Sequence, residues 1–179
     1  MSFVAGGRRV VLTGLGAVTP LGTDVPSYWQ RLVAGESGIG PTTLFDASAM
    51  TSRISGEVPD FDPSGVLDRK DVRRNDRATQ LGLVSTREAL EDAGLPVHLE
   101  GELAEMTGIL MGNGLGGTNT LIEQIAAWRI DGPRAVSPVC VTLAIANVPA
   151  GVAGCSGGGL GAYDSAASAG AAPGQGRGG

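Results

Sequence analysis

The hydrophobic positions of this chain alternate between the spacing of strands and the spacing of helices. Two apolar runs, residues 9–13 and 107–112, are bounded by glycine or polar residues, as buried strands are. Residues 53–58 alternate in polarity, which predicts a short edge strand that Pro59 ends. Strands that alternate with helices predict an α/β fold with a partly parallel sheet and right-handed crossovers.

Apolar positions at helical spacing predict three main helices. The first is capped by Thr23 or Asp24 and ends at Gly35, and the second covers residues 76–93. The third covers residues 119–130. Its apolar side chains are expected to face inward: Leu121, Ile122, Ile125 and Trp128.

The C-terminal part of the chain is rich in small residues. Residues 140–154 have a helical apolar pattern, although Pro149 is expected to kink or end that helix. Residues 155–161 contain so much glycine that we expect no stable element there. Residues 173–179 predict a Gly-rich disordered tail, which resembles a damaged reading frame or an early stop more than a designed terminus.

The composition and charge of the chain favour some classes of protein and argue against others. The chain has 179 residues, of which 42% are hydrophobic and 30 are glycine, enough for one domain with a real core and many tight turns. Its net charge of −5 argues against general nucleic-acid binding. The two cysteines, Cys140 and Cys155, have no metal or disulfide spacing, which fits a reducing cytoplasm. No apolar run predicts membrane insertion, so we expect a cytoplasmic protein.

Residues 161–174 (GAYDSAASAGAAPG) predict a short strand, a tight turn at Gly170 and the start of a helix. A turn of this kind places a nucleophile at a helix N-terminus, where backbone N–H groups and the helix dipole favour a thiolate. In this chain the turn position is a glycine, which has no side chain.

This stretch and residues 8–22 (RRVVLTGLGAVTPLG) together resemble the β-ketoacyl-[acyl-carrier-protein] synthases, the elongating condensing enzymes of the thiolase fold. In that family the turn reads roughly Ser/Thr-Ala-Cys-Ala-Ser-Gly, whereas residues 168–173 read SAGAAP. The resemblance is nearly colinear and makes residues 1–172 the N-terminal part of a β-ketoacyl synthase domain. It implies a thiolase-like α/β fold: the first half of a duplicated sheet with helices packed on it, expected to be incomplete and therefore poorly soluble or partly molten.

The resemblance implies a parent activity of acyl transfer from acyl carrier protein and decarboxylative condensation with malonyl carrier protein, in fatty-acid or polyketide synthesis. It implies no metal or other cofactor, and a homodimer in the full-length family. The family's basic segment, thought to receive the carrier protein, matches Arg69, Lys70, Arg73 and Arg74. The alternative for these four residues is a solvated helix face with internal ion pairs. Leu115 matches a bulky residue that shapes the acyl pocket, and a packed turn residue is the alternative.

The nucleophile that the resemblance implies is missing. Gly170 stands at its position, and a glycine cannot attack a thioester. Cys155, in GCSGG, is the alternative thiol, although the gap-free alignment places it well before the turn. The one histidine, His98, matches no catalytic position of the family. The chain alone is therefore predicted to be inactive in condensation.

Two other functions stay open. Some polyketide systems pair a condensing subunit with a sister subunit that lacks the cysteine, so the chain fits a non-catalytic, chain-length-factor-like partner. Residues 112–117 (GNGLGG) fit the G-x-G-x-x-G pattern of nucleotide-binding α/β proteins. A dinucleotide fold also needs a second strand that ends in an acid about 20 residues later. At that place this sequence has the turn DGPR, residues 131–134.

Overall fold

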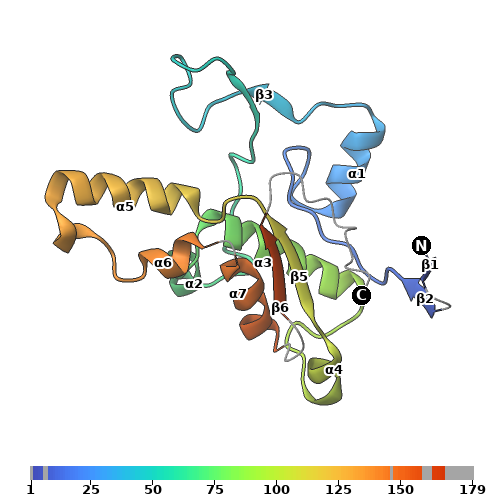
Figure 1. The fold of residues 1–179 in the computed structure, drawn as a ribbon. Coiled ribbons are helices and arrows are strands. Elements are labelled where there is room, and N and C mark those ends of the chain that lie inside the picture. The colour runs from blue at the N-terminus through green and yellow to red at the C-terminus, as the bar shows by residue number, and fades with distance from the viewer. Residues whose placement is uncertain (1, 6–7, 146, 159–162, 168–179) are drawn as a thin grey trace. The chain divides into compact units, whose positions relative to one another are not determined.

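The computed structural model describes residues 2–5, 8–145, 147–158 and 163–167. Figure 1 shows the helices and strands along the chain, which divides into two structural units. The first unit comprises Met1–Gly65 and Val84–Val97, and the second comprises Val66–Leu83 and His98–Gly179. Helix α3 (Arg77–Asp92) therefore supplies residues to both units, which are described separately below.

The first unit contains two pairs of antiparallel strands. β1 (Ser2–Ala5) pairs with β2 (Arg8–Val11), and β3 (Ile39–Pro41) pairs with β4 (Ile54–Gly56). The edge strand expected at residues 53–58 is confirmed by β4. A strand is present over part of the expected range 9–13, but the prediction that it is buried is wrong. Among the described residues β2 pairs only with β1, and Val10 is 50% exposed.

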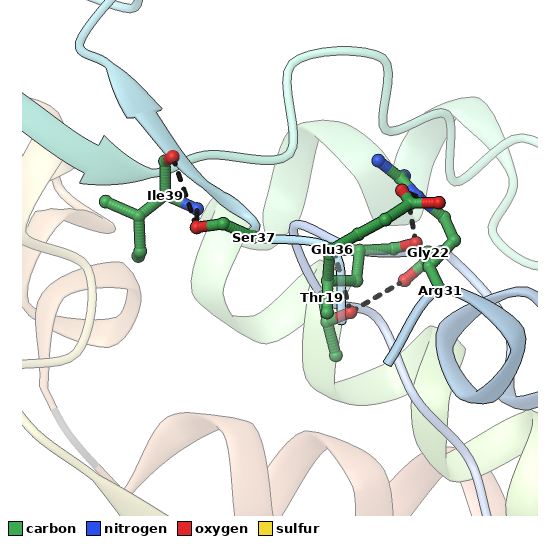
Figure 2. Close-up of polar contacts among 7 residues, drawn as sticks. Thr19, Gly22, Arg31, Glu36, Ser37 and Ile39 are labelled. Carbon is green, nitrogen blue, oxygen red and sulfur yellow. Dashed lines mark hydrogen bonds and ion pairs between the residues drawn. The ribbon is translucent and has the colours of Figure 1, made fainter. Parts of the chain in front are cut away.

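Helix α1 (Val25–Val33) begins at the predicted cap. The carboxylate of Asp24 accepts a hydrogen bond from the Ser27 amide at 2.7 Å, and Gly35 follows the helix with a φ of +74°. Figure 2 shows the hydroxyl of Thr19 donating to the Gly22 carbonyl, and Arg31 paired with Glu36. These contacts fix the chain on both sides of the helix.

The glycine-rich segment at residues 14–22 lies directly against the C-terminal part of α3. A side chain at Gly14 or Gly16 would collide with carbonyl oxygens of that helix, so glycine is required there by close approach. The Glu88 carboxylate accepts hydrogen bonds from the backbone amides of Ala17 at 2.8 Å and Val25 at 2.7 Å. One side chain therefore anchors both the glycine segment and the first turn of α1.

Replacing Glu88 by alanine is expected to lower the free energy of unfolding by about 2 kcal/mol, because two part-buried amides lose a charged acceptor. Urea unfolding would measure this loss. Glu91→Ala is the matched control, since Glu91 is 57% exposed and pairs with Arg87 on the same helix. That variant should lose no more than about 0.5 kcal/mol. Equal losses in the two variants would contradict the anchoring role of Glu88.

The second unit is built on a parallel strand pair. β5 (Ile109–Asn113) pairs with β6 (Tyr163–Ala167), with Ile109 opposite Tyr163, and the two strands lie side by side in Figure 1. The parallel pairing confirms the sheet type expected from the alternation of strands and helices. The described residues of this unit form six further helical segments: α2 (Arg69–Arg74), α4 (Gly101–Met106), α5 (Thr118–Asp131), the 3₁₀ turn η1 (Pro133–Ala135), α6 (Cys140–Ala144) and α7 (Val148–Gly157).

Pro149 divides the C-terminal helical segment as expected, because α6 ends before it and α7 begins with it in the first turn. The expectation of no stable element at residues 155–161 is wrong for residues 155–157, which continue α7. Gly158 closes this helix in the left-handed conformation with a φ of +70°, and the Leu99 amide donates to the Gly157 carbonyl at 2.7 Å. The helix is stabilised by these tertiary and capping contacts in spite of its glycines.

The core of the second unit is small and consists mainly of small or branched side chains. Its most buried members are Thr79, Leu83, Leu99, Ala104, Ala150 and Ala153. Met111 of β5 lies so close to Gly82 of α3 that a Cβ at Gly82 would meet its methyl carbon at 3.3 Å. The expected tail at residues 173–179 lies outside the described residues.

Candidate functional site

The four basic residues predicted to receive a carrier protein all lie on α2, and all are exposed. Arg69 and Arg73 are one helical turn apart, as are Lys70 and Arg74. Asp68 caps the helix, with its carboxylate accepting from the amides of Lys70 and Asp71, each at 2.7 Å. These hydrogen bonds, chiefly the one from Asp71, and the charges of Lys70 and Arg73 lower the pKa of Asp68. The cap therefore stays ionised at neutral pH.

The C-terminal end of α2 is held on α3 by Gln80. Its side-chain amide donates to the carbonyl oxygens of Val72 at 2.9 Å and Asn75 at 2.7 Å. The Asn75 side chain in turn donates to the Asp71 carbonyl at 2.9 Å. The basic helix is thus closed at both ends by side-chain hydrogen bonds, although it is only 6 residues long.

The turn between β5 and α5 carries Leu115, whose side chain is 79% exposed. The Gly116 amide donates to the Asn113 side chain at 3.1 Å, and the Gly117 amide donates to the Ala144 carbonyl at 3.2 Å. A Cβ at Gly117 would overlap the Leu143 carbonyl oxygen. The turn is therefore fixed at its base, while Leu115 projects from it; the alternative of a leucine packed in the core is wrong for this structure.

Asp76 joins the start of α3 to the start of α5. Its carboxylate accepts from the Ala78 amide at 3.0 Å and from the Thr120 hydroxyl at 2.5 Å. The N-cap of α5 is Gly117, which offers no side-chain acceptor, and the Asp76 carboxyl carbon lies 3.0 Å from where a Cβ at Gly117 would stand. A carboxylate at a helix N-terminus is stabilised by the free amides and the dipole of that helix.

The apolar side chains of α5 do not face inward as predicted. Leu121, Ile122, Ile125 and Trp128 are 45, 60, 47 and 57% exposed. Some of them form the wall of a shallow apolar groove of about 200 Å³, which is lined by Leu121, Gln124, Ile125, Trp128, Val136 and Cys140. The Gln124 side chain accepts from the Ser137 amide at 2.6 Å and so holds the loop before α6 against α5.

Of the two candidate positions for the nucleophile, the described residues include Cys155. Gly170 lies outside the described residues. Cys155 lies in the last turn of α7, whereas a thiolate is favoured at the N-terminal end of a helix. His98 is exposed in the second unit, between α3 and α4.

The residues that sequence reasoning missed are the polar ones that fix the turn and the helices. In the sequence, Asp76, Gln80 and Thr120 are parts of helical patterns and nothing more. The signal available in the sequence was weak: Asp76 precedes a long helix, where an acid is a common cap. Nothing in the sequence indicated that its partner would be Thr120.

The strand, glycine turn and helix that suggested nucleotide binding are present as β5, residues 112–117 and α5. A dinucleotide fold requires a second, acid-terminated strand, and the described residues directly after α5 form no such strand. Instead the chain forms η1 and α6. The described residues at that place therefore do not supply the strand that the nucleotide-binding alternative requires.

Residues 7–174 match the family model described as "Beta-ketoacyl synthase, N-terminal domain". The 3-oxoacyl-[acyl-carrier-protein] synthase 2 of Coxiella burnetii is 43% identical over 145 residues, which are 81% of this chain and 34% of that protein. The protein of the same name from Synechocystis is 42% identical over 146 residues, with the same shares. The chain thus spans about a third of the length of these curated relatives.

Solved structures show the same fold. The ishigamide ketosynthase/chain length factor is similar with a TM-score of 0.76 and 28% identity, over 88% of this chain and 39% of that chain. A type II PKS ketosynthase, in complex with its acyl-carrier protein and bound to the hexaketide, is similar in fold with a TM-score of 0.67, over 87% of this chain and 40% of that chain. None of the helices that the structure describes is both long and apolar enough to cross a membrane.

Proposed function

Because the chain belongs to the β-ketoacyl synthase family through its N-terminal domain, we propose that it carries the carrier-protein docking helix and part of the acyl pocket of a 3-oxoacyl-[acyl-carrier-protein] synthase. The parent reaction is acyl transfer from an acyl carrier protein, followed by decarboxylative condensation with malonyl carrier protein in fatty-acid or polyketide synthesis. The protein acts in the cytoplasm, and full-length members of the family form homodimers. The chain by itself does not condense, since Gly170 replaces the nucleophile.

One observation carries this proposal: the exposed basic helix α2 and the turn that presents Leu115 lie in the same structural unit. Acyl carrier proteins are acidic, so a helix with four exposed cations offers the complementary charge. An acyl chain is apolar, and Leu115 and the groove along α5 supply apolar surface for it. The Coxiella burnetii and Synechocystis relatives are both named as synthases of a 3-oxoacyl-[acyl-carrier-protein].

Reversing two charges on α2, with Arg73→Glu and Arg74→Glu together, is expected to weaken binding of holo acyl carrier protein about tenfold at low salt. Two attractive contacts become repulsive, and each exposed charge pair is worth up to about 1 kcal/mol. Isothermal titration with purified holo acyl carrier protein would measure the change.

The matched control replaces Arg53 and Arg134, which are also exposed but lie outside α2, by glutamate. This control changes the net charge by the same amount and is expected to leave the affinity within about twofold, apart from a general effect that salt removes. Equal weakening in both double variants would show that net charge, and not α2, attracts the carrier protein. No binding by the unsubstituted chain would overturn the proposed function.

A second candidate function is a non-catalytic partner of a condensing enzyme. It is favoured by the glycine at position 170 and by the similarity to a ketosynthase/chain length factor structure. Such a partner forms a stable heterodimer with a complete synthase. Co-purification of the tagged chain with a full-length 3-oxoacyl synthase from the same cells would favour this function, and recovery of the chain without one would exclude it.

A further inference from the structure

Asp76 stands between the two features on which the proposed function rests. It follows α2 after a single residue, Asn75, whose carbonyl is held by Gln80. It also accepts the hydroxyl hydrogen bond of Thr120, in the first turn of α5, directly after the turn that presents Leu115. One carboxylate therefore connects the end of the basic helix to the base of the Leu115 turn.

The connection is short and directional. The Thr120 hydroxyl lies 2.5 Å from one carboxylate oxygen of Asp76, and the other oxygen accepts from the Ala78 amide at 3.0 Å. A hydrogen bond to an ionised acceptor is stronger than one between neutral groups. Both oxygens are thus engaged, so the carboxylate cannot turn without breaking one of the two bonds.

Two backbone amides also fix the base of the turn. The Gly117 amide bonds to Ala144 of α6, and the Gly116 amide bonds to Asn113 within the turn itself. Neither of these two bonds reaches α2 or the start of α3. The Asp76–Thr120 bond is thus a direct side-chain link between the start of α5, after the turn, and the residues that follow the basic helix.

We infer that Asp76 and Thr120 are a positioning pair that holds the Leu115 turn in register with the carrier-docking helix. This inference rests on the proposed function, and neither residue is assigned a contact with substrate. A carrier protein that is docked on α2 presents its acyl chain from one position. The acyl pocket must therefore stay at a constant distance from α2. Loss of the pair should weaken the recognition of the acyl chain and leave the docking of the carrier protein itself unchanged.

The test compares Thr120→Val with Thr120→Ser in the full chain. Valine keeps the shape of threonine and removes the hydroxyl, whereas serine keeps the hydroxyl. For each variant, dissociation constants are measured for holo and for octanoyl acyl carrier protein. The unsubstituted chain and Thr120→Ser should bind the octanoyl form more tightly than the holo form. In Thr120→Val, the ratio of the holo to the octanoyl dissociation constant should fall about fivefold, which is at the low end of measured coupling between two sites. The dissociation constant for the holo form should change by no more than about twofold.

Hydrogen exchange supplies a second, independent readout. Holo carrier protein docked on α2 should slow the exchange of amides at residues 112–120 in the unsubstituted chain and in Thr120→Ser, but not in Thr120→Val. If Thr120→Val melts at a markedly lower temperature, Thr120→Ala replaces it in both measurements.

The outcomes separate this inference from the proposed function. If the unsubstituted chain binds neither form of the carrier protein, the proposed function fails and the positioning role fails with it. A second outcome is that the unsubstituted chain prefers the octanoyl form while Thr120→Val keeps the same ratio of dissociation constants and the same protection from hydrogen exchange. In that case only the positioning role is overturned. A fall of the ratio in Thr120→Val that Thr120→Ser does not share supports the pair.

Discussion

The purified chain is expected to gain no mass when it is incubated with octanoyl acyl carrier protein, and to form no 3-oxoacyl product when malonyl carrier protein is added. Condensation by this family begins with a cysteine thiolate that takes the acyl group, and the proposed match places Gly170 at the position of that cysteine. Loss of a covalent nucleophile lowers kcat by about 10⁶ in a serine protease, and a similar factor would place the reaction below detection. Intact-mass spectrometry and product analysis measure both steps.

An octanoyl adduct on the unsubstituted chain would contradict this expectation, and two variants would then identify the thiol. Cys155→Ser would abolish the adduct if Cys155 is the nucleophile, and Cys140→Ser would abolish it if the thiol in the groove beside α5 reacts. Alkylation of both thiols by iodoacetamide in denaturant serves as the control that they are reduced and available. An adduct that survives in both single variants and disappears after this alkylation would indicate nonspecific thioester exchange.

The sequence predicts those parts of the fold that depend on local pattern. α1 has the expected Asp24 cap, and α3 at Arg77–Asp92 has almost the expected bounds. β5 and the glycine turn after it also follow directly from an apolar run and the residues that end it. In each case the residues that decide the element lie within one or two turns of each other.

The exposure of a predicted apolar face depends on what else in the chain covers it. The spacing of Leu121, Ile125 and Trp128 predicts that they share a face of α5, which the groove confirms. Periodicity carries no information on whether another element covers that face, and here the three side chains remain about half exposed. For the same reason the burial expected for residues 9–13 was wrong.

Predictions from local propensity are wrong where contacts between residues far apart in the sequence stabilise an element. Glycine content argued against a helix at residues 155–157, but the Leu99 amide and the left-handed Gly158 complete α7 there. The Asp76–Thr120 bond joins residues 44 positions apart. No sequence periodicity relates two such residues. The pair is therefore evident only from the structure, in which the starts of α3 and α5 lie together.

Gly117→Ala is expected to lower the free energy of unfolding by about 3 kcal/mol, which is at the upper end for an added methyl group in a packed site. The new Cβ would overlap the Leu143 carbonyl oxygen and lie 3.0 Å from the Asp76 carboxyl carbon. A backbone carbonyl cannot rotate away as a flexible side chain can, so either α6 or the start of α5 must move. Urea unfolding would measure the loss.

Gly114→Ala is the matched control in the same turn. Nothing lies within 4 Å of the position of its Cβ, so this variant should remain within about 0.5 kcal/mol of the original chain. Hydrogen exchange separates two causes of instability: a clash at Leu143 should speed exchange in α6, whereas simple loss of the turn should not. Because a displaced turn also moves Thr120 from Asp76, Gly117→Ala should lose the preference for octanoyl carrier protein as Thr120→Val does. A stable Gly117→Ala protein that keeps this preference would mean that the close contact between the turn and α6 is not required for acyl recognition.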